Sequence, residues 1–470
     1  MYARVKRTRA IVSLWLVACL SVAITAPARA DTAPSSALRS YVAAADPSFG
    51  WQVRARGRVA GADYAELSLT SQTWRGQQWR HQLFIVRPDE VAPDTHAAVL
   101  FISGGRWKDA YLDPPGERAL PSGATIYVKL ARAARAPLAI LRQVPFQPIF
   151  DGLTEDDAIA YTFDRFLDDR DATWPLLLPM VKSAVRAMDT VQSYLLEEWS
   201  IDIAAFTVTG ASKRGWTTWL TAAVDPRVQA IAPMVIDVLN MESQMELARA
   251  VWGGPSEKIS PYTDRAITER LATPAGRELL AIVDPYSYRQ RLTMPKLVIN
   301  ATNDPYWPLT AAALYWDALP GEKRLLYVPN QGHGIRDYDR LLGAIAGLHR
   351  ELAGGPPLPA LDWQFDERDD RVVLTLASSE RPATVRGWAA SSPTLDFREA
   401  HWRRFEMRRD GARWRAEIRR PRHDHFALYG ETVFRKGRTA PLYLSTAVRT
   451  FEPRWPTEAS DASAGIVERR

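Results

Sequence analysis

The chain has 470 residues, of which 46% are hydrophobic and 24% are charged, a composition typical of folded globular proteins and not of disordered ones. Its formal net charge of +6 arises mainly in the first 30 residues, which hold five of the 60 basic residues and no acidic ones. The other 55 basic and 54 acidic residues nearly balance, so the charge gives no reason to expect a nucleic-acid partner. Cys19 is the only cysteine, which excludes disulfides and cysteine-ligated metals from the rest of the chain.

Residues 1–30 are similar to a secretory signal peptide. A basic start precedes an apolar run from Ile11 to Ile24, and Ala28-Arg29-Ala30 forms a cleavage site of the small-x-small type. This pattern predicts a secreted or periplasmic protein. An alternative is lipoprotein processing at Cys19, since the preceding residues resemble a lipobox, although the apolar run continues beyond Cys19. After residue 30 no apolar stretch is long enough to span a membrane.

The length after residue 30 suits two domains better than one. The Gly/Pro cluster at 354–359 follows a helical pattern and is typical of a linker. We therefore expect an α/β domain over residues 31–355 and an all-β domain over 360–456. The polar tail at 457–470 is expected to be disordered.

The predicted elements begin with a short helix near 37–44 and three strands at 53–59, 65–70 and 79–86. These strands alternate apolar and polar residues, as antiparallel edge strands do. Later strands are continuously apolar, as expected of buried parallel strands, and an amphipathic helix is predicted at 175–199. The later strands are predicted at 97–102, 137–141, 206–210, 228–236, 296–300 and 325–328.

The central motif is Gly210-Ala211-Ser212-Lys213-Arg214-Gly215, between a predicted strand and a predicted helix. It resembles the nucleophile elbow of α/β-hydrolases, G-x-S-x-G, except that the second glycine comes one residue late. A P-loop is excluded because Trp216 stands where its lysine should be, and a dinucleotide fingerprint lacks its third glycine. Ser212 is the candidate nucleophile.

Two later strand ends complete a catalytic triad. Asp304 follows the strand at 296–300, and His333 follows the strand at 325–328 between two glycines. The order Ser, Asp, His is the one that α/β-hydrolases share. Each residue alone could be an ordinary loop residue, but three suitable residues at three strand ends favour a triad of Ser212, Asp304 and His333.

The oxyanion donors are expected to be the N–H groups of Gly105, after the strand at 97–102, and of Lys213. The alternative for Gly105 is a loop glycine that needs a positive φ. The Lys213 side chain is expected to be solvated at the helix end. Thr154-Glu155-Asp156-Asp157 is interpreted as a helix N-cap.

Several stretches resemble the PhoPQ-activated pathogenicity-related protein family, which also includes autocrine proliferation repressor-like proteins. The resemblance covers most of residues 40–350 and implies an α/β-hydrolase fold with the same triad. It also implies that the late second glycine is a feature of the family, similar to that of glucuronoyl esterases. In those esterases the basic residue after the serine assists the oxyanion, which would give the Lys213 charge a role. The matching stretches include LFISGG (100–105), EDDAIAYTFDRF (155–166), VTGASKRGWTTWL (208–220), KLVINATND (296–304) and YVPNQGH (327–333).

The fold expected is therefore an α/β-hydrolase fold, a mostly parallel sheet flanked by helices, with a helical lid over 237–294. The C-terminal residues 360–456 alternate in short runs, and Asp410-Gly411 is a hairpin signal, so a β-sandwich of immunoglobulin or fibronectin type is expected. Between Trp402 and Arg438 there are 12 basic and five acidic residues. This excess of positive charge is either a solvated strand face or a surface that binds an anionic envelope glycan.

The function expected is an exported serine hydrolase acting on a small-molecule ester, or on a peptide or amide with the same triad. It needs no cofactor or metal. A third interpretation is a secreted binding or virulence-associated factor that retains the scaffold without turnover. Four aromatic residues are candidates for substrate binding, and each could equally be core: Trp107, Trp216, Tyr306 and Trp307.

Overall fold

The computed structural model describes residues 34–92, 94–112 and 123–454. The expected signal peptide, Cys19 and the polar tail lie outside these residues. One edge of the central sheet is antiparallel and consists of β1 (Gly50–Val59), β2 (Ala62–Trp74) and β3 (Gln77–Pro88). The three strands predicted from alternation are confirmed, and β3 joins them to the middle of the sheet by pairing antiparallel with β5 (Leu138–Leu141).

The middle of the sheet is parallel, as the continuously apolar runs predicted. The order across it is β5, β4, β6, β7, β8, β9. Because these strands are parallel, their carboxyl ends lie at one edge of the sheet. The strand order reverses at β4, since β5 pairs with one side of β4 and β6 with the other. Such a reversal leaves a crevice where ligands bind in open α/β sheets. The bounds are β4 (Ala97–Ile102), β6 (Ala205–Ala211), β7 (Val228–Met234), β8 (Lys296–Ala301) and β9 (Lys323–Val328).

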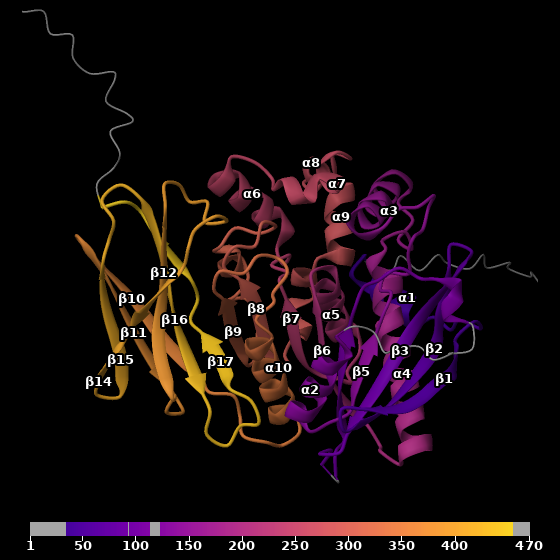
Figure 1. Cartoon of the computed structure of the whole chain (residues 1–470). Coiled ribbons are helices and arrows are strands. Elements are labelled where there is room, and N and C mark those ends of the chain that lie inside the picture. Colours follow the sequence, from indigo (N-terminus) through magenta and orange to yellow (C-terminus); the bar gives the residue numbers. More distant parts are fainter. Residues whose placement is uncertain (1–33, 93, 113–122, 455–470) are drawn as a thin grey trace, which may run out of the picture.

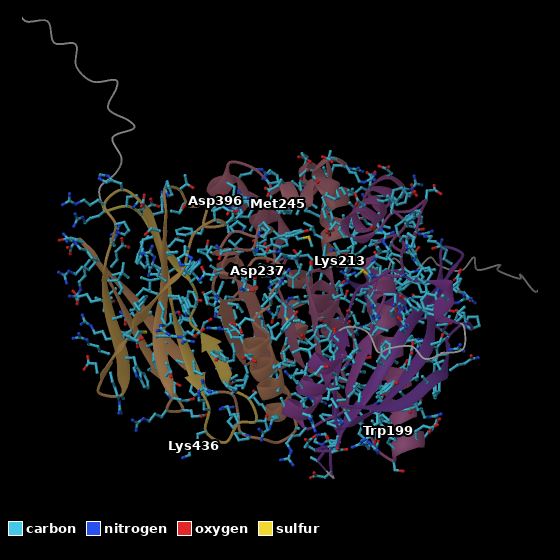
Figure 2. All side chains as sticks on the ribbon, in the orientation of Figure 1. Trp199, Lys213, Asp237, Met245, Asp396 and Lys436 are labelled. Atoms are coloured by element: carbon cyan, nitrogen blue, oxygen red, sulfur yellow. The ribbon has the colours of Figure 1, made fainter. Side chains whose placement is uncertain are left out.

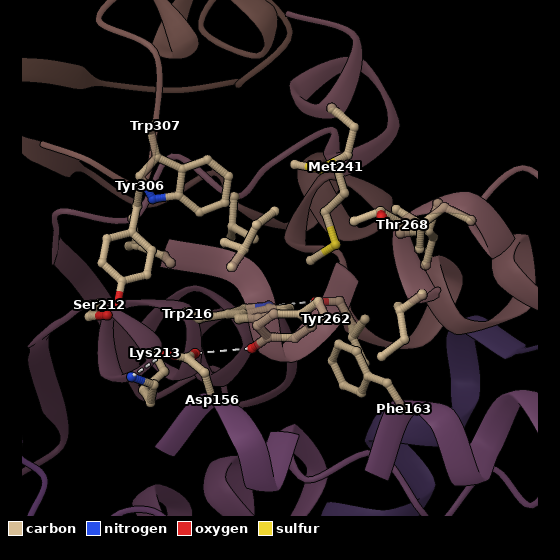
Figure 3. Close-up of a pocket in the computed structure, with 18 of the residues that line it drawn as sticks. Asp156, Phe163, Ser212, Lys213, Trp216, Met241, Tyr262, Thr268, Tyr306 and Trp307 are labelled. Atoms are coloured by element: carbon tan, nitrogen blue, oxygen red, sulfur yellow. Dashed lines mark hydrogen bonds and ion pairs between the residues drawn. The ribbon is translucent and has the colours of Figure 1, made fainter. Parts of the chain in front are cut away.

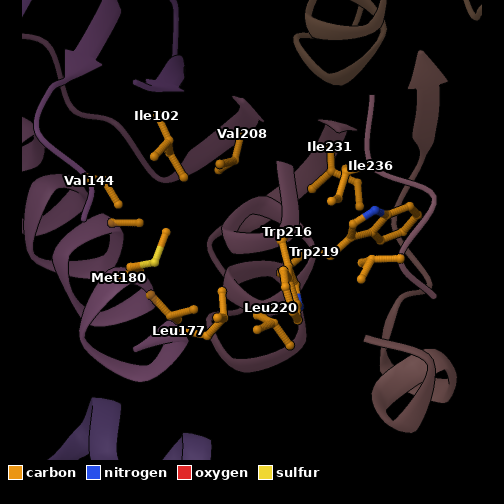
Figure 4. Packing of buried hydrophobic residues seen from close by; sticks show 14 of the residues in the cluster. Ile102, Val144, Leu177, Met180, Val208, Trp216, Trp219, Leu220, Ile231 and Ile236 are labelled. Atoms are coloured by element: carbon orange, nitrogen blue, oxygen red, sulfur yellow. The ribbon is translucent and has the colours of Figure 1, made fainter. Parts of the chain in front are cut away.

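Helices cover both faces of this parallel region (Figure 1). On one face lie α2 (Ala124–Ala134) and α10 (Tyr338–Leu352), packed against each other. On the other lie α1 (Pro34–Ala43), α4 (Leu177–Trp199) and α5 (Lys213–Val224). Figure 4 shows side chains of α4 and α5, among them Met180 and Trp219, in one hydrophobic cluster with sheet residues such as Ile102 and Ile231. No helix of the described residues is long and apolar enough to cross a membrane.

A group of helices lies over the carboxyl edge of the strands (Figure 1). It comprises α6 (Met241–Trp252), α7 (Ser260–Thr263), α8 (Ile267–Arg270) and α9 (Pro274–Val283), beside the earlier helix α3 (Glu155–Asp169). Figure 2 places Met245 of α6 above Lys213 and Asp237, which lie in the interior. The segment predicted to be a helical excursion, 237–294, is thus helical.

The C-terminal strands extend the central sheet. Although the Gly/Pro cluster at 354–359 is a loop after α10, β17 pairs with β9 through Ser445 and Leu325, so one 14-stranded sheet runs through both halves of the chain. It ends in the order β17, β16, β12, β13, with β18 beside β16. The strands on this side are β12 (Thr384–Ser392), β13 (Arg403–Glu406), β16 (His425–Phe434), β17 (Leu442–Ser445) and β18 (Arg449–Phe451).

A separate antiparallel sheet of four strands packs against this extension. Its order is β10, β11, β15, β14, and a hydrophobic cluster that includes Leu374, Ala416 and Leu428 lies between the two sheets. The Asp410-Gly411 hairpin is confirmed, since Asp410 pairs with Arg413. The bounds are β10 (Leu361–Arg368), β11 (Arg371–Ser378), β14 (Arg408–Asp410) and β15 (Arg413–Arg419).

The strand β16 is long and lies within the C-terminal extension of the sheet, yet it carries a buried carboxylate. Its Glu431 is fully buried and would interrupt an apolar pattern. The carboxylate is compensated by ion pairs with Arg340 of α10, at 3.0 Å, and Arg386 of β12, at 2.5 Å. These cations come from distant parts of the chain, so the sequence around residue 431 does not reveal them.

A buried histidine links α10 to the sheet and makes stability depend on pH. His349 Nδ1 lies 3.0 Å from the Thr207 hydroxyl of β6. Burial, with repulsion from His96, lowers the pKa of His349 from 6.5 to about 4. Between these values the unfolded chain binds a proton that the folded chain does not, so the stabilisation present above pH 6.5 is lost as the pH falls through the window.

When the pH falls from about 7 to about 4.5, the free energy of unfolding should decrease less in His349→Gln than in the wild type. We expect the two decreases to differ by on the order of 2 kcal/mol. Urea unfolding at both pH values measures this difference. The comparison with the wild type is needed because burial raises the pKa of Asp237 and of Asp284 to about 6. These two carboxyl groups make the folded state more stable as the pH falls, and they do so equally in both proteins. Equal losses in the two proteins would contradict the assignment to His349.

Candidate active site

The structure brings Ser212, His333 and Asp304 together at the carboxyl edge of the parallel strands. Ser212 follows β6, Asp304 follows β8 and His333 follows β9. The Ser212 Oγ is 2.8 Å from His333 Nε2, and His333 Nδ1 is 3.0 and 2.9 Å from the two carboxylate oxygens of Asp304. The convergence that the strand ends predicted is therefore present.

The loop geometry fixes the imidazole between its two partners. Asp304 is 7% exposed, and its Oδ1 also accepts the Tyr306 N–H at 2.9 Å. The Tyr306 ring stacks on the His333 ring with centroids 4.1 Å apart. A carboxylate can only accept at Nδ1, so Nδ1 carries the proton and Nε2 is left to accept the hydroxyl proton of Ser212.

The backbone of Ser212 is strained, as at a nucleophile elbow. Its φ of 57° and ψ of −131° are rare for a residue with a Cβ. The conformation is held from both sides, because the Ser212 N–H donates to the Met234 carbonyl at 2.8 Å and the Ser212 carbonyl accepts the Trp216 N–H at 3.0 Å. The strain presents the hydroxyl above the sheet edge.

Gly215 has a steric role that accounts for its late position. In the first turn of α5 it faces the sheet, and a Cβ there would lie 2.6 Å from Ile236 Cγ2 and 2.9 Å from the Gly210 carbonyl oxygen. A Cβ on Gly210 would likewise lie 2.8 Å from the Arg214 carbonyl oxygen. The two glycines let α5 approach β6 closely, which is the purpose of the glycines in the usual motif.

We expect Gly215→Ala to destabilise the protein by about 1–3 kcal/mol, because the methyl group meets backbone that cannot move aside. This outweighs the gain in helix propensity, about 1 kcal/mol. Thermal or urea unfolding measures the change. Gly254→Ala is the matched control, since a Cβ there meets nothing within 4 Å. A Gly215→Ala protein as stable as the control would refute the steric explanation.

The expected oxyanion donors lie at the correct ends of β4 and α5. Gly105 has a φ of 127°, which a residue with a Cβ rarely adopts. Lys213 is the first residue of α5, so its N–H has no acceptor within its own helix. The neighbouring Gly104 also matters, because a Cβ there would lie 2.4 Å from the Arg214 guanidinium.

The Lys213 side chain is not solvated, which corrects the sequence-based expectation. It is 9% exposed, and its Nζ lies 3.0 Å from Glu155 and 3.1 Å from Asp156. Arg214 donates two hydrogen bonds to Glu155, at 2.8 and 2.7 Å. Burial favours the neutral form of Glu155, but Arg214 and Lys213 outweigh it and lower its pKa to about 2. Thr154 occupies the predicted N-cap position of α3 and the three acidic residues lie in its first turn, but the Thr154 side chain makes no capping hydrogen bond.

Three of the four candidate aromatic residues line one cavity beside Ser212. Trp216, Tyr306 and Trp307 border it together with Ser212 and His333 (Figure 3). Trp107 does not border this cavity. Its ring packs against Tyr111 and Phe146, and its indole N–H donates to Asp109 at 3.1 Å.

The C-terminal part of the chain contacts the loops that carry Asp304 and His333, which the sequence did not predict. The amide of Asn303, next to Asp304, donates to the carbonyls of Arg398 and Ala400 at 3.0 and 2.7 Å. Asn330, in the loop before His333, exchanges two hydrogen bonds with the backbone of Trp402, at 3.0 and 2.8 Å. The segment after β12 thus braces both loops.

Among the described residues no group of three or more histidine, cysteine, aspartate or glutamate side chains could hold a metal ion.

Comparison with known proteins identifies the family. The family model of the PhoPQ-activated pathogenicity-related protein matches residues 38–398. The chain belongs to this family. Within it, the autocrine proliferation repressor protein A of Dictyostelium discoideum is 32% identical over 390 residues, which are 77% of this chain and 76% of that protein. The fold is a mixed α/β sheet flanked by helices, and its parallel strand order and the turn at Ser212 resemble those of α/β-hydrolases.

More distant similarities to esterases accompany the family match. The acetyl esterase Axe7A of Xylanibacter ruminicola is 27% identical to this family member over 167 residues, 36% of this chain and 34% of that protein. Among solved structures, acetyl xylan esterase 1 of Thermoanaerobacterium gives a TM-score of 0.47 at 16% identity, with 68% of this chain and 93% of that chain covered. A glucuronoyl esterase of Solibacter usitatus gives 0.38 at 15% identity, with 67% and 91% covered. With TM-scores this low, neither structure carries an argument about the substrate.

Proposed function

We propose that this chain is an exported serine hydrolase that cleaves a carboxylic ester through an acyl-enzyme. His333 takes the proton from Ser212 Oγ as this oxygen attacks the carbonyl carbon, and returns it to the oxygen of the leaving alcohol. Asp304 holds the imidazole tautomer and stabilises the imidazolium. The N–H groups of Gly105 and Lys213 donate to the oxyanion of the tetrahedral intermediate. Water then attacks the acyl carbon, with His333 again the base, and Ser212 is released.

One observation carries the proposal: the unbroken hydrogen-bonded chain from Ser212 through His333 to Asp304, with a strained serine backbone at its start. A structural serine would have no need of a half-buried imidazole 2.8 Å from its hydroxyl or of a φ of 57°. The relative named acetyl esterase supports an ester as the first choice, although it matches only 36% of this chain.

The surrounding elements complete the proposed enzyme. We propose that α6, α7, α8 and α9 form a lid over the site, because they lie above the strand ends and line the cavity. We also propose that residues 360–456 form a β-sandwich unit, on the ground that two sheets enclose their own apolar cluster there.

The test compares turnover of p-nitrophenyl esters with turnover of peptide p-nitroanilides by the purified mature chain. We expect ester hydrolysis that Ser212→Ala abolishes. Faster peptide turnover would favour the peptidase alternative, which uses the same residues. Turnover of neither class, together with no labelling by a fluorophosphonate, would favour the non-catalytic binding scaffold.

A further inference from the structure

The cavity at Ser212 is the feature on which the substrate class depends. It holds about 760 Å³ of empty space, part of it open to solvent, and Ser212 and His333 border it. Figure 3 shows Tyr306 and Trp307 on the side of Ser212 and Met241 and Thr268 on the opposite side.

The walls away from Ser212 are almost entirely apolar. They come from the start of the helical excursion after β7, from α3 and from the helices α6, α7, α8 and α9. Thioether and branched aliphatic side chains adapt to flexible apolar ligands better than to sugars, which need a hydrogen-bonding partner for each hydroxyl. Representative wall residues are Ile236, Met241, Met245, Leu271, Leu279 and Val283.

Several polar groups at the wall are engaged with protein partners, whereas the buried indole N–H of Trp307 has no hydrogen-bond partner among the described residues. Asp156 pairs with Lys213 at 3.1 Å and accepts the Tyr262 hydroxyl at 3.1 Å. The indole N–H of Trp216 donates to the Val283 carbonyl at 2.6 Å. Glu155 and Asp156 together compensate the charge of Lys213, so this cation is already paired within the protein.

Tyr306 is the neutral polar group nearest to the reacting residues. Burial, with the charges of Asp156, Asp304 and Glu155, raises the pKa of Tyr306 to about 12, so its hydroxyl stays protonated. An ester carbonyl or ether oxygen suits such a donor, whereas an extended carboxylate or polyhydroxy chain would leave polar groups unpaired against the apolar walls.

We propose, on the basis of the hydrolase function above, that the substrate is a neutral ester whose acyl chain is aliphatic and longer than acetyl. The chain lies in the cavity between α6 and α9, with the ester carbonyl at Ser212. Each methylene buried there is worth about fourfold in binding. Short acetyl groups would leave most of the cavity unfilled.

The test uses p-nitrophenyl esters from acetate to decanoate with the wild-type chain. We expect kcat/KM to rise about two- to fourfold for each added methylene over the first several carbons and then to level off. In parallel, alkyl fluorophosphonates with methyl to octyl chains should label Ser212 at rates that rise in the same way. Acetate as the best ester, with labelling rates independent of chain length, would overturn the proposal.

A matched pair of variants places the chain within the cavity. Met245 lines the cavity on α6, and the adjacent Glu246 is exposed and does not. Met245→Trp should lower kcat/KM for octanoate at least tenfold while changing that for acetate less than threefold, and Glu246→Trp should change neither. Thermal unfolding checks that both fold. Should Met245→Trp fail to fold, the wild-type chain-length series still decides the proposal.

The outcomes separate this inference from the proposed function. Labelling of Ser212 without chain-length preference would leave the hydrolase standing and remove the aliphatic acyl chain. No labelling and no ester turnover would remove both. Faster cleavage of peptide anilides with leucine or phenylalanine at the scissile bond than of any ester would assign the cavity to a peptide side chain instead.

Discussion

Ser212→Ala is expected to lower kcat for ester hydrolysis by about 10⁶-fold, because the attacking oxygen is lost and the remaining groups can only polarise the carbonyl. The fold should persist, since the Ser212 Oγ contacts only His333 Nε2 at 2.8 Å among the hydrogen bonds of the described residues. Steady-state turnover of the best p-nitrophenyl ester measures the loss.

The control for this variant is Thr221→Ala, which removes a hydroxyl group from α5, the helix that follows Ser212. Its oxygen bonds to the Thr217 carbonyl at 2.7 Å within α5 and does not border the cavity. We expect near wild-type kcat from it. If Ser212→Ala retained activity within tenfold of this control, Ser212 would not be the nucleophile.

Asp304→Asn is expected to lower kcat by about 10⁴-fold with little change in KM. The asparagine amide keeps the shape of the carboxylate but presents a donor or a neutral oxygen to His333 Nδ1. The imidazole then loses the tautomer that leaves Nε2 free to accept, and the imidazolium loses its counter-charge. The pH profile of kcat, together with kcat and KM separately, distinguishes this effect from a packing defect.

Asp237→Asn is the matched control, because Asp237 is a second buried carboxylate near Asp304. It follows β7, the strand next to β8, and its oxygens accept from Tyr315 and, at 2.8 Å, from Asn300. We expect Asp237→Asn to change kcat less than tenfold. Equal losses in the two variants would mean that Asp304 acts only through packing.

The convergence of Ser212, Asp304 and His333 could be predicted from the sequence because the information for it is local. Each residue follows a strand that is recognisable from its own apolar run, and parallel strands bring their carboxyl ends to one edge. The late glycine looked like a departure from the motif. Packing explains its position, since a Cβ on residue 215 would lie only 2.9 Å from the Gly210 carbonyl oxygen.

The surroundings of the triad could not be predicted, because they depend on pairs distant in the sequence. Nothing near Lys213 indicates that Glu155 and Asp156, nearly 60 residues away, take its charge. Nothing near Asn303 indicates that its amide binds the carbonyls around residue 400. Opposite charges and asparagine amides are common on protein surfaces, so only the fold distinguishes these contacts from solvated residues.

The most direct measurement of the central claim is the position of a covalent adduct. The wild-type chain is treated with a fluorophosphonate, digested, and its peptides are analysed by mass spectrometry. The account predicts one phosphonylated residue, Ser212, with an adduct that Ser212→Ala eliminates and His333→Ala slows severely. An ester-hydrolysing protein with its adduct on another residue, or with no adduct, would contradict it.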